Sequence, residues 1–397
     1  MLQQRAFSNT NLLLLAFTYL CYFGQIGVLI PYLGVFLDAR GFSSADIGQL
    51  TAFITLSRIV GPYLWAIVAD KSGKNLRTLQ LGCLLSLITL SLVLLVDSFW
   101  GLTLAIGLMM MFSTAILPQI EVLTMSCVQG NSTRYGRIRL WGSIGYIVLT
   151  IFTGMMIDVF STEAPVIITL AVLSLLFFVL LFLLEPQNNL VRQQSQQSIW
   201  YKLKTPVFVS FLLSALLLQL SFGPYYGFFT LYARDLGYSG QATGWLIAVG
   251  VMVEVGIFVI AGSVIKRCGV KWILITCMSL TAIRWALLAA FAHNVYLLVI
   301  SQMLHAFSFG MTHAASIHFI HQYFGKIFQS RGQAIYISVA FGIGGAMGNF
   351  VAGHLWSQGQ GAELTFWLAS IAAFCGALCL LPIASKHLNN LPQPQVD

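Results

Sequence analysis

Charged residues are scarce in this sequence. Asp, Glu, Lys and Arg make up only 8% of its 397 residues, whereas hydrophobic residues make up 58%. Soluble domains carry about 25% charged residues, so the composition excludes an ordinary soluble protein. It indicates instead a polytopic membrane protein made of helices. At about 20 residues per span plus short loops, the chain has room for roughly twelve transmembrane helices.

Cysteine patterns and nucleotide-binding motifs are missing as well. The seven cysteines form no CxxC pair and imply neither a metal site nor a disulfide framework. No glycine-rich phosphate-binding motif occurs, so ATP is not the expected energy source, and we expect no cofactor and no metal. We also expect no removable signal sequence, because polar residues 1–11 lead into an apolar run that is too long for one.

Breaks in hydropathy predict twelve spans and two halves. The spans cover residues 11–37, 45–69, 76–96, 99–127, 137–159, 164–184, 205–233, 241–265, 271–292, 294–323, 331–357 and 362–384. The longest polar interruption separates six spans from six. We therefore predict an N-terminal half at 1–184, a flexible cytoplasmic linker at 185–204, and a C-terminal half with a short cytoplasmic tail at 205–397.

The net charge of +8 would suggest a nucleic-acid partner only if the positions of the bases were ignored. Of the basic residues outside the predicted spans, all but Arg40 and Arg234 fall on one side, and the opposite loops are mainly acidic. By the positive-inside rule this pattern places both termini and the linker in the cytoplasm. We expect a bacterial inner-membrane protein that works as a monomer, with no nucleic-acid partner.

A basic turn recurs in the two halves. Between spans 2 and 3 it contains Asp70, Lys71, Gly73 and Lys74, and between spans 8 and 9 it contains Lys266, Arg267 and Gly269. The glycine permits a tight bend, and the charges can contact neighbouring helix ends during gating. The alternative is that they are only orientation charges. Recurrence favours a transporter made by duplication, with two pseudo-symmetric six-helix halves and a site between them.

Several ionisable side chains fall inside the predicted spans, where a charge costs about 2.5–3.5 kcal/mol on insertion scales. They are Arg58, Glu121, Arg139, Glu254, Arg284, His305 and His313. Such groups usually face a cavity or one another. Arginine can bind a carboxylate through its planar fork, and a desolvated carboxyl group can carry a proton.

Glu121 and Arg139 are placed symmetrically about Gly130, so a helical hairpin brings them to similar depth. They could bind substrate, or they could form a static ion pair. Glu254 has no base near it in sequence and could be a proton carrier, or it could pair with an arginine of another helix. Arg58, close to Gly61 and Pro62, could instead brace a contact between helices.

His305 and His313 lie about 12 Å apart along one helix and could relay protons, although a lone buried histidine is more often a packing residue. His318 and His321 have the spacing of two metal ligands, but no third ligand is evident, which favours an interfacial role. Tyr225 and Tyr226 are candidates for a ring-lined cavity. The alternative for such aromatic residues is packing or contact with lipid.

These residues resemble a known family. The turn from Ala66 to Lys74 resembles the signature turn of the major facilitator superfamily, with Ala66 in place of the usual glycine. The block from Tyr135 to Gly145 resembles the proton symporter branch related to lactose permease, and particularly phenylpropionate permease-like transporters, over essentially the whole chain. The resemblance implies the major facilitator fold, with twelve transmembrane helices in two six-helix halves.

The resemblance also suggests individual roles. Glu121, Arg139 and Tyr146 match a substrate-binding carboxylate, an arginine and a stacking aromatic residue. Arg284 and His305 match an arginine and a histidine of proton coupling, and Glu254 resembles a site carboxylate. The sequence departs from the lactose pattern at Ser308, where a glutamate is expected, and it lacks the span-11 lysine. A proton would therefore have to be carried by Glu254, Glu121 or a histidine.

The sequence thus predicts a secondary transporter, not an enzyme, that imports a small aromatic carboxylate with protons by alternating access. Substrate would be bound by Glu121, Arg139, Tyr146, Tyr225, Tyr226 and Arg284, with proton coupling by Glu254, His305 and His313. Within transport, the alternatives are a sugar or nucleoside proton symporter and a drug exporter. Outside transport they are a membrane-embedded enzyme that uses the span-10 histidines, and a sensor.

Overall fold

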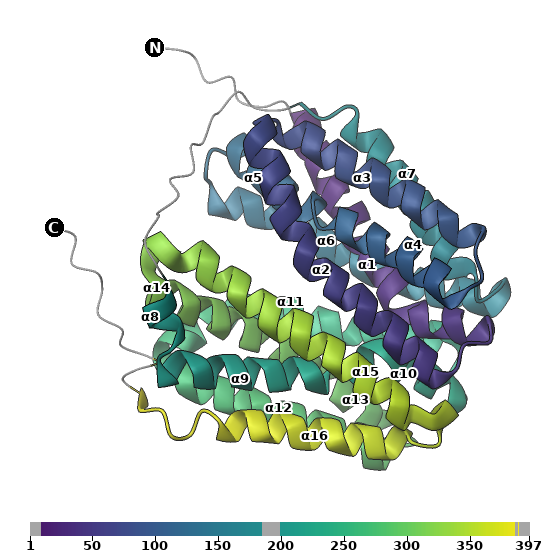
Figure 1. Ribbon diagram of the computed structural model, residues 1–397, viewed down its shortest axis with the longest axis vertical. Coiled ribbons are helices and arrows are strands. Elements are labelled where there is room, and N and C mark those ends of the chain that lie inside the picture. Colours follow the sequence, from purple (N-terminus) through teal and green to yellow (C-terminus); the bar gives the residue numbers. More distant parts are fainter. Residues whose placement is uncertain (1–8, 185–198, 386–387, 389–397) are drawn as a thin grey trace. The chain divides into compact units, whose positions relative to one another are not determined.

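The computed structural model describes residues 9–184, 199–385 and 388, apart from the side chains of Asp70, Ser132, Lys326 and Ile327. The described ranges consist of helices and turns, without a strand (Figure 1). Most of the predicted linker, residues 185–198, lies outside them. Ten described segments are long and apolar enough to cross a membrane, and the shorter apolar helices α7 and α16 complete the predicted twelve.

The first six spans are formed by seven helices. They are α1 (Asn9–Ala39), α2 (Ser44–Ser72), α3 (Asn75–Ser91) with the turn η1 (Leu92–Leu94), α4 (Phe99–Ser113), α5 (Ile116–Cys127), α6 (Ser132–Val159) and α7 (Ala164–Leu180). The predicted fourth span is thus interrupted between α4 and α5. Helix α6 begins five residues earlier than the sequence predicted, because the Asn131 side chain accepts a hydrogen bond from the Arg134 N–H and caps the helix.

The remaining spans begin after a short helix, α8 (Trp200–Leu203). They are formed by α9 (Pro206–Ser221), α10 (Gly223–Asp235), α11 (Gly240–Cys268), α12 (Val270–Phe291), α13 (Val295–Met303), η2 (Ala306–Met311), α14 (Thr312–Tyr336), η3 (Ile337–Gly344), α15 (Gly345–Trp356), η4 (Ser357–Gly359) and α16 (Ala362–Leu378). The seventh span is interrupted at Gly223-Pro224, because proline has no N–H to continue the helical hydrogen bonds. Two segments, η2 and η3, are π-helical, which the sequence did not predict.

Contacts group the chain into two compact units. Unit 1 comprises Met1–Phe42, Phe53–Val191 and Tyr238–Ala248, and unit 2 comprises Ser43–Ala52, Arg192–Gly237 and Val249–Asp397. The first turns of α2 therefore belong to unit 2, and the first turns of α11 belong to unit 1. The latter are held by Asp158, whose carboxylate accepts hydrogen bonds from the N–H groups of Gly240 and Gln241, at 2.7 and 2.8 Å.

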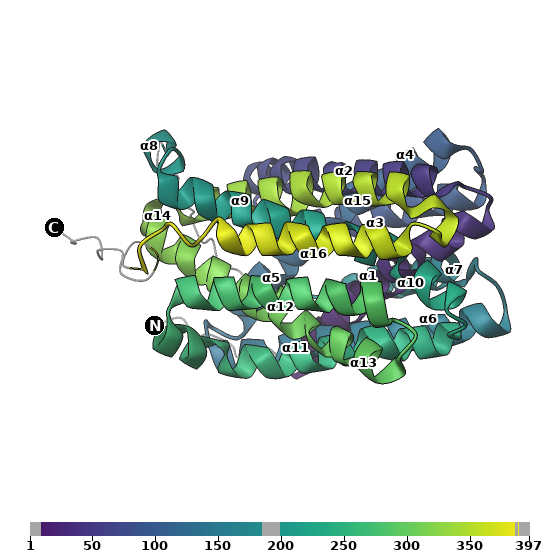
Figure 2. The same cartoon turned by 90° about the horizontal axis from the view of Figure 1, so that it is seen from below.

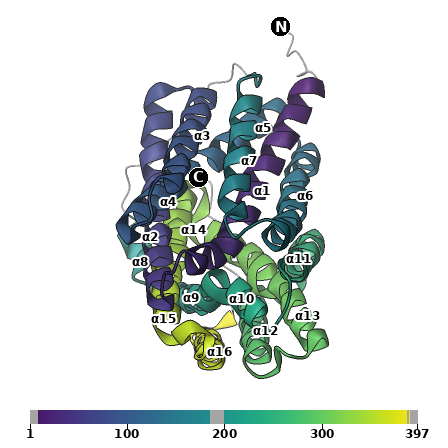
Figure 3. The same ribbon diagram turned by 90° about the vertical axis from the view of Figure 1, so that its right-hand side faces the viewer.

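Within unit 1, helix α1 lies between α6 and α7 (Figure 3). The approach to α6 is close, because a Cβ atom on Gly145 would lie only 2.2 Å from the carbonyl oxygen of Leu20. Helix α7 also packs against α3. The apolar faces of these helices are therefore buried against one another through small residues, as is common in membrane helix pairs.

Unit 2 repeats this pairing. Helix α9 packs against η3, α15 and α16, as α1 packs against α6 and α7, and α12 lies along α16 (Figure 2). Gly344 and Gly348 allow the approach to α9, because Cβ atoms there would lie 2.6 and 2.3 Å from the carbonyl oxygens of Leu216 and Leu220. The glycines of span 11 therefore form a face for close packing against α9.

A side chain from the third span fastens the end of the sixth span in each repeat. Gln80 of α3 donates a hydrogen bond to the Leu180 carbonyl at 2.8 Å. In the second repeat, buried Lys271 donates to the carbonyls of Leu381 and Ile383, at 2.9 and 2.5 Å. Both side chains satisfy carbonyl groups that a helix end leaves without intrahelical partners.

Arg40, in the turn after α1, joins three connections of unit 1. Its guanidinium makes two 2.9 Å contacts with the Glu163 carboxylate and one of 3.1 Å with Asp97, and it donates to the carbonyls of Val93 and Val96. The bonds to Glu163 raise the pKa of Arg40 above its ordinary value. The arrangement fixes the connections α1–α2, α3–α4 and α6–α7 to one another.

The described end of the predicted linker, residues 199–204, contacts α14. Its last residues form α8, and the Lys202 ammonium donates to the Tyr323 carbonyl at 2.8 Å. The Tyr323 hydroxyl donates back to the Lys202 carbonyl at 2.7 Å. Close by, Gly325 has φ +65°, which ends the first part of α14. These carbonyls at the end of a helical segment thus gain a cationic donor, and the bounds of the linker stay a prediction.

Candidate functional site

The predicted site residues of unit 1 gather on α1, α5 and α6. The Arg139 guanidinium lies over the Phe23 ring of α1, with its central carbon 3.7 Å from the ring centroid, and 5.7 Å from that of Tyr19. Gly142 makes room for this stack, since a Cβ atom there would lie 2.6 Å from Phe23 and 2.9 Å from Arg139. A stacked guanidinium keeps its edge available for hydrogen bonding to an anion or a hydroxyl group.

Glu121 lies beside this stack. Its carboxylate accepts a hydrogen bond from the Tyr135 hydroxyl at 3.3 Å. Arg139 is near enough to interact with it electrostatically, but no ion pair within 4.0 Å joins the two side chains among the described residues. Gly130, with φ +75°, makes the turn between their helices. The predicted hairpin is therefore present, whereas the alternative of a static ion pair is not what this structure shows.

Two further polar side chains belong to this region. Tyr146, half-buried on α6, packs against Gly27 of α1. Gln25, also on α1, is fully buried, and neither its amide nitrogen nor its amide oxygen has a hydrogen-bond partner in the described part of the chain. Sequence reasoning missed Gln25, although an amide within a long apolar run was a usable signal. Arg58, by contrast, is exposed on α2.

In unit 2 three predicted residues from three spans form one chain of contacts. His305 Nε2 lies 3.4 Å from Glu254 Oε2, and His305 Nδ1 lies 3.1 Å from Arg284 Nη1. Arg284 can only donate, so Nδ1 must accept, and the proton of the neutral ring is on Nε2, facing Glu254. The sequence placed these residues in spans 8, 9 and 10, and the structure brings them together.

Arg284 is fully buried, and its Nε and Nη2 atoms have no hydrogen-bond partner among the described residues. Its guanidinium carbon lies 4.3 Å from the Trp285 ring centroid, 4.4 Å from that of Tyr225 and 5.6 Å from that of Phe222. A buried charge normally has a counter-ion, because leaving it unpaired is costly. Aromatic rings surround this guanidinium. Its Nε and Nη2 groups donate no hydrogen bond to a described residue, so they are available to a ligand.

Tyr225 and Tyr226, on α10, contribute differently to that wall. The Tyr225 hydroxyl donates to Gln302 Oε1 at 3.0 Å, which fixes the ring beside Arg284. Tyr226 is half-buried and stacks on Phe222, with ring centroids 5.3 Å apart. Sequence reasoning did not identify Gln302 as the partner of Tyr225, because nothing in the sequence marks a neutral amide as facing that tyrosine.

The π-helical segment η2 shapes the span that carries His305. Its wide turn is closed by Thr312, whose hydroxyl donates to the Phe307 carbonyl five residues earlier, at 2.8 Å. Gly310 lies against Glu254, and a Cβ atom there would be 2.8 Å from Glu254 Cγ. Such π-helical turns often occur at functional sites. Gly310 was not among the predicted residues, and its role depends on this close approach.

The rings of His305, Phe309 and His313 stack along the same span. Centroids are 5.7 Å apart for the first pair and 6.0 Å for the second, with interplanar angles of 5° and 6°. His313 Nδ1 has no hydrogen-bond partner in the described chain. The two histidines therefore lie on one face of this span, with Phe309 between them.

The remaining predicted positions are distributed along the basic turns and span 10. Gly73 has φ +62° and Gly269 has φ +76°, which confirms the two glycine bends, and Lys71, Lys74, Lys266 and Arg267 are exposed around them. The Asp70 side chain lies outside the described set. The gating role of the turns stays a prediction.

Ser308, where the lactose pattern has a glutamate, is buried and donates to the Leu304 carbonyl.

Comparisons with known proteins agree with this architecture. The family model described as "MFS_1 like family" matches residues 12–368. A probable 3-phenylpropionic acid transporter of Escherichia coli is 29% identical, over 90% of this chain and 94% of its own length. A maltose permease of Geobacillus stearothermophilus is 26% identical, over 93% of each chain.

Among solved structures, the crystal structure of the nucleoside transporter NupG superposes with a TM-score of 0.79. The match covers 94% of this chain and 99% of that one, at 19% sequence identity, and shows a shared fold. Together with the twelve apolar helices, these matches establish a multi-pass membrane protein. The chain belongs to the MFS_1 like family and is an MFS permease-like transporter.

Proposed function

We propose that this transporter imports a small aromatic carboxylate, such as 3-phenylpropionate, together with a proton, by alternating access of its two halves. The observation that carries the proposal is buried Arg284, with two nitrogens unpaired within the described chain and a wall of rings around them. The name of the Escherichia coli relative points to the same class of substrate.

Substrate recognition follows from the chemistry around Arg284. Two N–H groups of one guanidinium can bind both oxygens of a carboxylate, which fixes the orientation of the anion. Tyr225 and Trp285 present ring faces beside the guanidinium, and an aromatic substrate can pack against such surfaces. A substrate carboxylate would also supply a counter-charge to Arg284.

The proposed proton coupling follows from which group donates each hydrogen bond in the series Glu254, His305 and Arg284. With Glu254 ionised, every contact is matched: Arg284 donates to His305 Nδ1, and His305 Nε2–H faces the carboxylate. Protonation of Glu254 leaves one carboxyl oxygen that can still accept from Nε2–H, but it removes the negative charge that strengthens this contact. The ring is then polarised less by its neighbour, so Nδ1 becomes a weaker acceptor for Arg284. A proton on Glu254 therefore weakens the Arg284–His305 bond and makes Arg284 more available to the substrate anion.

The pH gradient can supply the free energy for this symport. One proton carried with one monovalent carboxylate moves no net charge, so the pH gradient is the driving force. A difference of one pH unit corresponds to about 1.4 kcal/mol, or about tenfold accumulation. An electrogenic cycle would instead gain about 2.3 kcal/mol per charge for each 100 mV.

Other parts of the proposal rest on sequence patterns and resemblance. Glu121, Arg139 and Tyr146 take part in substrate binding, His313 is a second proton-binding group, and the basic turns act in gating. The protein works in the bacterial inner membrane with both termini and the linker in the cytoplasm. Its halves are residues 1–184 and 205–397, and the monomer is the transporting unit.

A sugar or nucleoside proton symporter is the second candidate. It is favoured by Glu121, hydrogen-bonded to Tyr135, beside Arg139 stacked on Phe23. A carboxylate and an arginine next to a ring also suit recognition of hydroxyl groups. The maltose permease among the relatives agrees with this possibility. A drug exporter would differ in the direction of flux, a sensor would bind without flux, and a membrane enzyme would convert its ligand.

Uptake by proteoliposomes tests the proposal. Labelled 3-phenylpropionate, maltose and uridine would be offered with and without an imposed pH gradient, and the proton flux that accompanies each would be recorded. We expect saturable uptake of the aromatic acid, driven by an acidic exterior and accompanied by protons. Saturable uptake of the sugar or the nucleoside, without uptake of the aromatic acid, would overturn the choice of substrate.

A further inference from the structure

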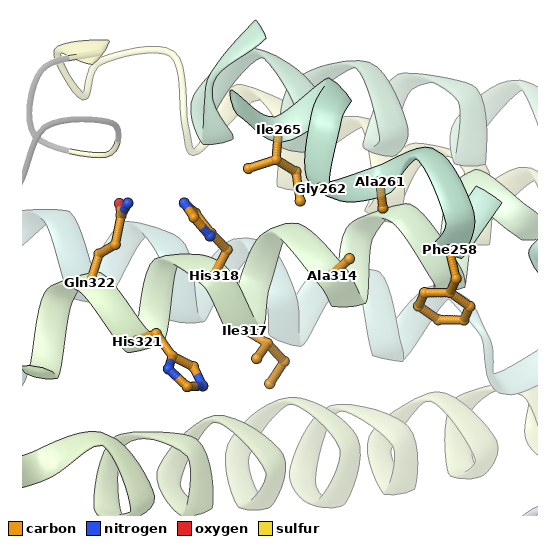
Figure 4. A pocket seen from close by; sticks show the side chains of 9 residues that line it. All are labelled: Phe258, Ala261, Gly262, Ile265, Ala314, Ile317, His318, His321 and Gln322. Atoms are coloured by element: carbon orange, nitrogen blue, oxygen red, sulfur yellow. The ribbon is translucent and has the colours of Figure 1, made fainter. Parts of the chain in front are cut away.

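A groove of about 560 Å³ lies between α11 and α14, and Arg284 is not among the residues that line it (Figure 4). Phe258, Gly262 and Ile265 line it from α11, and Ala314, His318 and Gln322 are among the residues that line it from α14. Figure 4 shows His318 pointing toward α11, whereas His321 points away from it. All these residues belong to unit 2.

The groove lies further along the two spans that carry Glu254 and His305. On α11, Phe258 comes one turn after Glu254, and its ring would lie 3.7 Å from a Cβ atom on Gly310. On the other side, His313 is followed one turn later by Ile317, which lines the groove. The same two helices that bear the proposed proton site thus form the walls of the groove.

The lining has an apolar part and a polar end. Phe258, Ile265 and Ala314 supply apolar surface, while His318 and Gln322 supply hydrogen-bonding groups, and none of the described lining residues carries a carboxylate. Lys266, next to Ile265, is near enough to His318 to interact with it electrostatically. The volume is within the range of about 300–1,000 Å³ that is usual for small-molecule sites.

We infer that this groove is a second binding position for an organic anion with an apolar body, of the same class as the proposed cargo. The apolar body would lie along Phe258 and Ile265, and the carboxylate would lie toward His318, Gln322 and Lys266. The inference rests on the proposed function for the class of ligand. It adds a position on the path between Arg284 and the basic turn at the end of α11.

Two glycines of α11 make a matched test possible. Gly262 lines the groove, whereas Gly256 does not, and at both positions a Cβ atom would have no heavy atom of the described chain within 4 Å. Each can therefore be changed to cysteine without a clash. The exposed native thiols of Cys268 and Cys375 would first be replaced by serine. The rate of maleimide labelling in proteoliposomes would then be measured with and without 3-phenylpropionate.

We expect the ligand, at ten times its dissociation constant, to slow labelling of Gly262→Cys about tenfold and to leave Gly256→Cys unchanged. The protection should persist when Arg284→Gln disables the proposed transport site, and it should be lost with His318→Ala or Lys266→Gln. The neutral amide of the same acid should not protect. The full-length protein is used in every arm.

The outcomes separate this inference from the proposed function. Transport of 3-phenylpropionate without protection at position 262 would overturn the second position and leave the proposed function standing. Protection without transport would support the position and overturn the function, and the absence of both would overturn both. Protection that Arg284→Gln abolishes would also overturn the inference. Protection that depends only on anionic lipid in the vesicles would assign the groove to a lipid headgroup, which overturns it as well.

Discussion

His305 joins Glu254 and Arg284 through its two ring nitrogens, at 3.4 and 3.1 Å. Because the arginine can only donate, the imidazole must accept on one side and donate on the other. The charge state of Glu254 is therefore linked to the hydrogen bonding of Arg284, although the two side chains come from different helices, α11 and α12. This linkage gives the proposed symport a physical basis within unit 2.

Replacing Glu254 by glutamine should abolish accumulation driven by a pH gradient and spare exchange of substrate across the membrane. The amide keeps the size of the side chain but cannot take up a proton at neutral pH. Wild-type vesicles should reach about tenfold accumulation for one pH unit, whereas the variant should only equilibrate. Uptake and counterflow of labelled substrate would measure both. Normal accumulation by the variant would exclude Glu254 as the proton carrier.

Replacing Arg284 by lysine should weaken binding of 3-phenylpropionate by about tenfold or more. Lysine keeps the charge but loses the planar fork, and a charge-assisted hydrogen bond is worth about 1.5–3 kcal/mol. Equilibrium binding to the purified protein would measure the effect. A matched change, Arg40→Lys, alters a guanidinium far along the chain and should leave the affinity unchanged. Equal weakening by both variants would contradict a specific role for Arg284.

Replacing Gly310 by alanine should displace Glu254 from His305, because the added methyl group would lie 2.8 Å from Glu254 Cγ. Loss of that charge-assisted contact should reduce pH-driven uptake by about tenfold. Exchange and folding should be retained. Gly256→Ala, on α11, adds a methyl group in open space and should behave like the wild type. Unchanged uptake by Gly310→Ala would show that Glu254 works without this close approach.

Replacing Arg40 by lysine should lower stability without affecting transport. The paired bonds to Glu163 and the bonds to the carbonyls of Val93 and Val96 depend on the guanidinium fork. We expect a loss of about 1 kcal/mol, since the group is partly exposed. Because the pKa of Arg40 is raised, its contribution is present at neutral pH and is lost only when the pH rises through its titration range.

Thermal unfolding of the purified protein would test this prediction. Arg234→Lys is a suitable control, because Arg234 is exposed and pairs with its exposed neighbour Asp235. A lower unfolding temperature for the control than for Arg40→Lys would contradict the role assigned to Arg40.

The positions of the spans could be predicted closely because a membrane requires long apolar helices, and breaks in hydropathy mark their ends. Features that depend on individual hydrogen bonds could not. The early start of α6 depends on the Asn131 cap, and the docking of α8 depends on Lys202 reaching the Tyr323 carbonyl. The π-helical turns also left no clear pattern in hydropathy, since they change the helix by only one residue per turn.

The candidate site was predictable where a charge lies in an apolar run. Glu254, Arg284 and His305 stood out because such groups are costly in a membrane, and they proved to be neighbours. Gln302 and Gly310 were not recognised in this way, because an amide in an apolar run is a weaker signal than a charge, and a glycine gives no such signal. Their roles come from tertiary contacts with Tyr225 and Glu254.

The parallel rings of His305, Phe309 and His313 have a consequence for leakage. A phenyl ring has no exchangeable proton, so Phe309 is an insulator between the two imidazoles. A proton held at Glu254 and His305 finds no hydrogen-bonded path through this stack of described rings toward His313. In the proposed symport, the stacking that packs the span would also help to keep the proton at Glu254 and His305 until substrate has moved, as tight coupling of two fluxes requires.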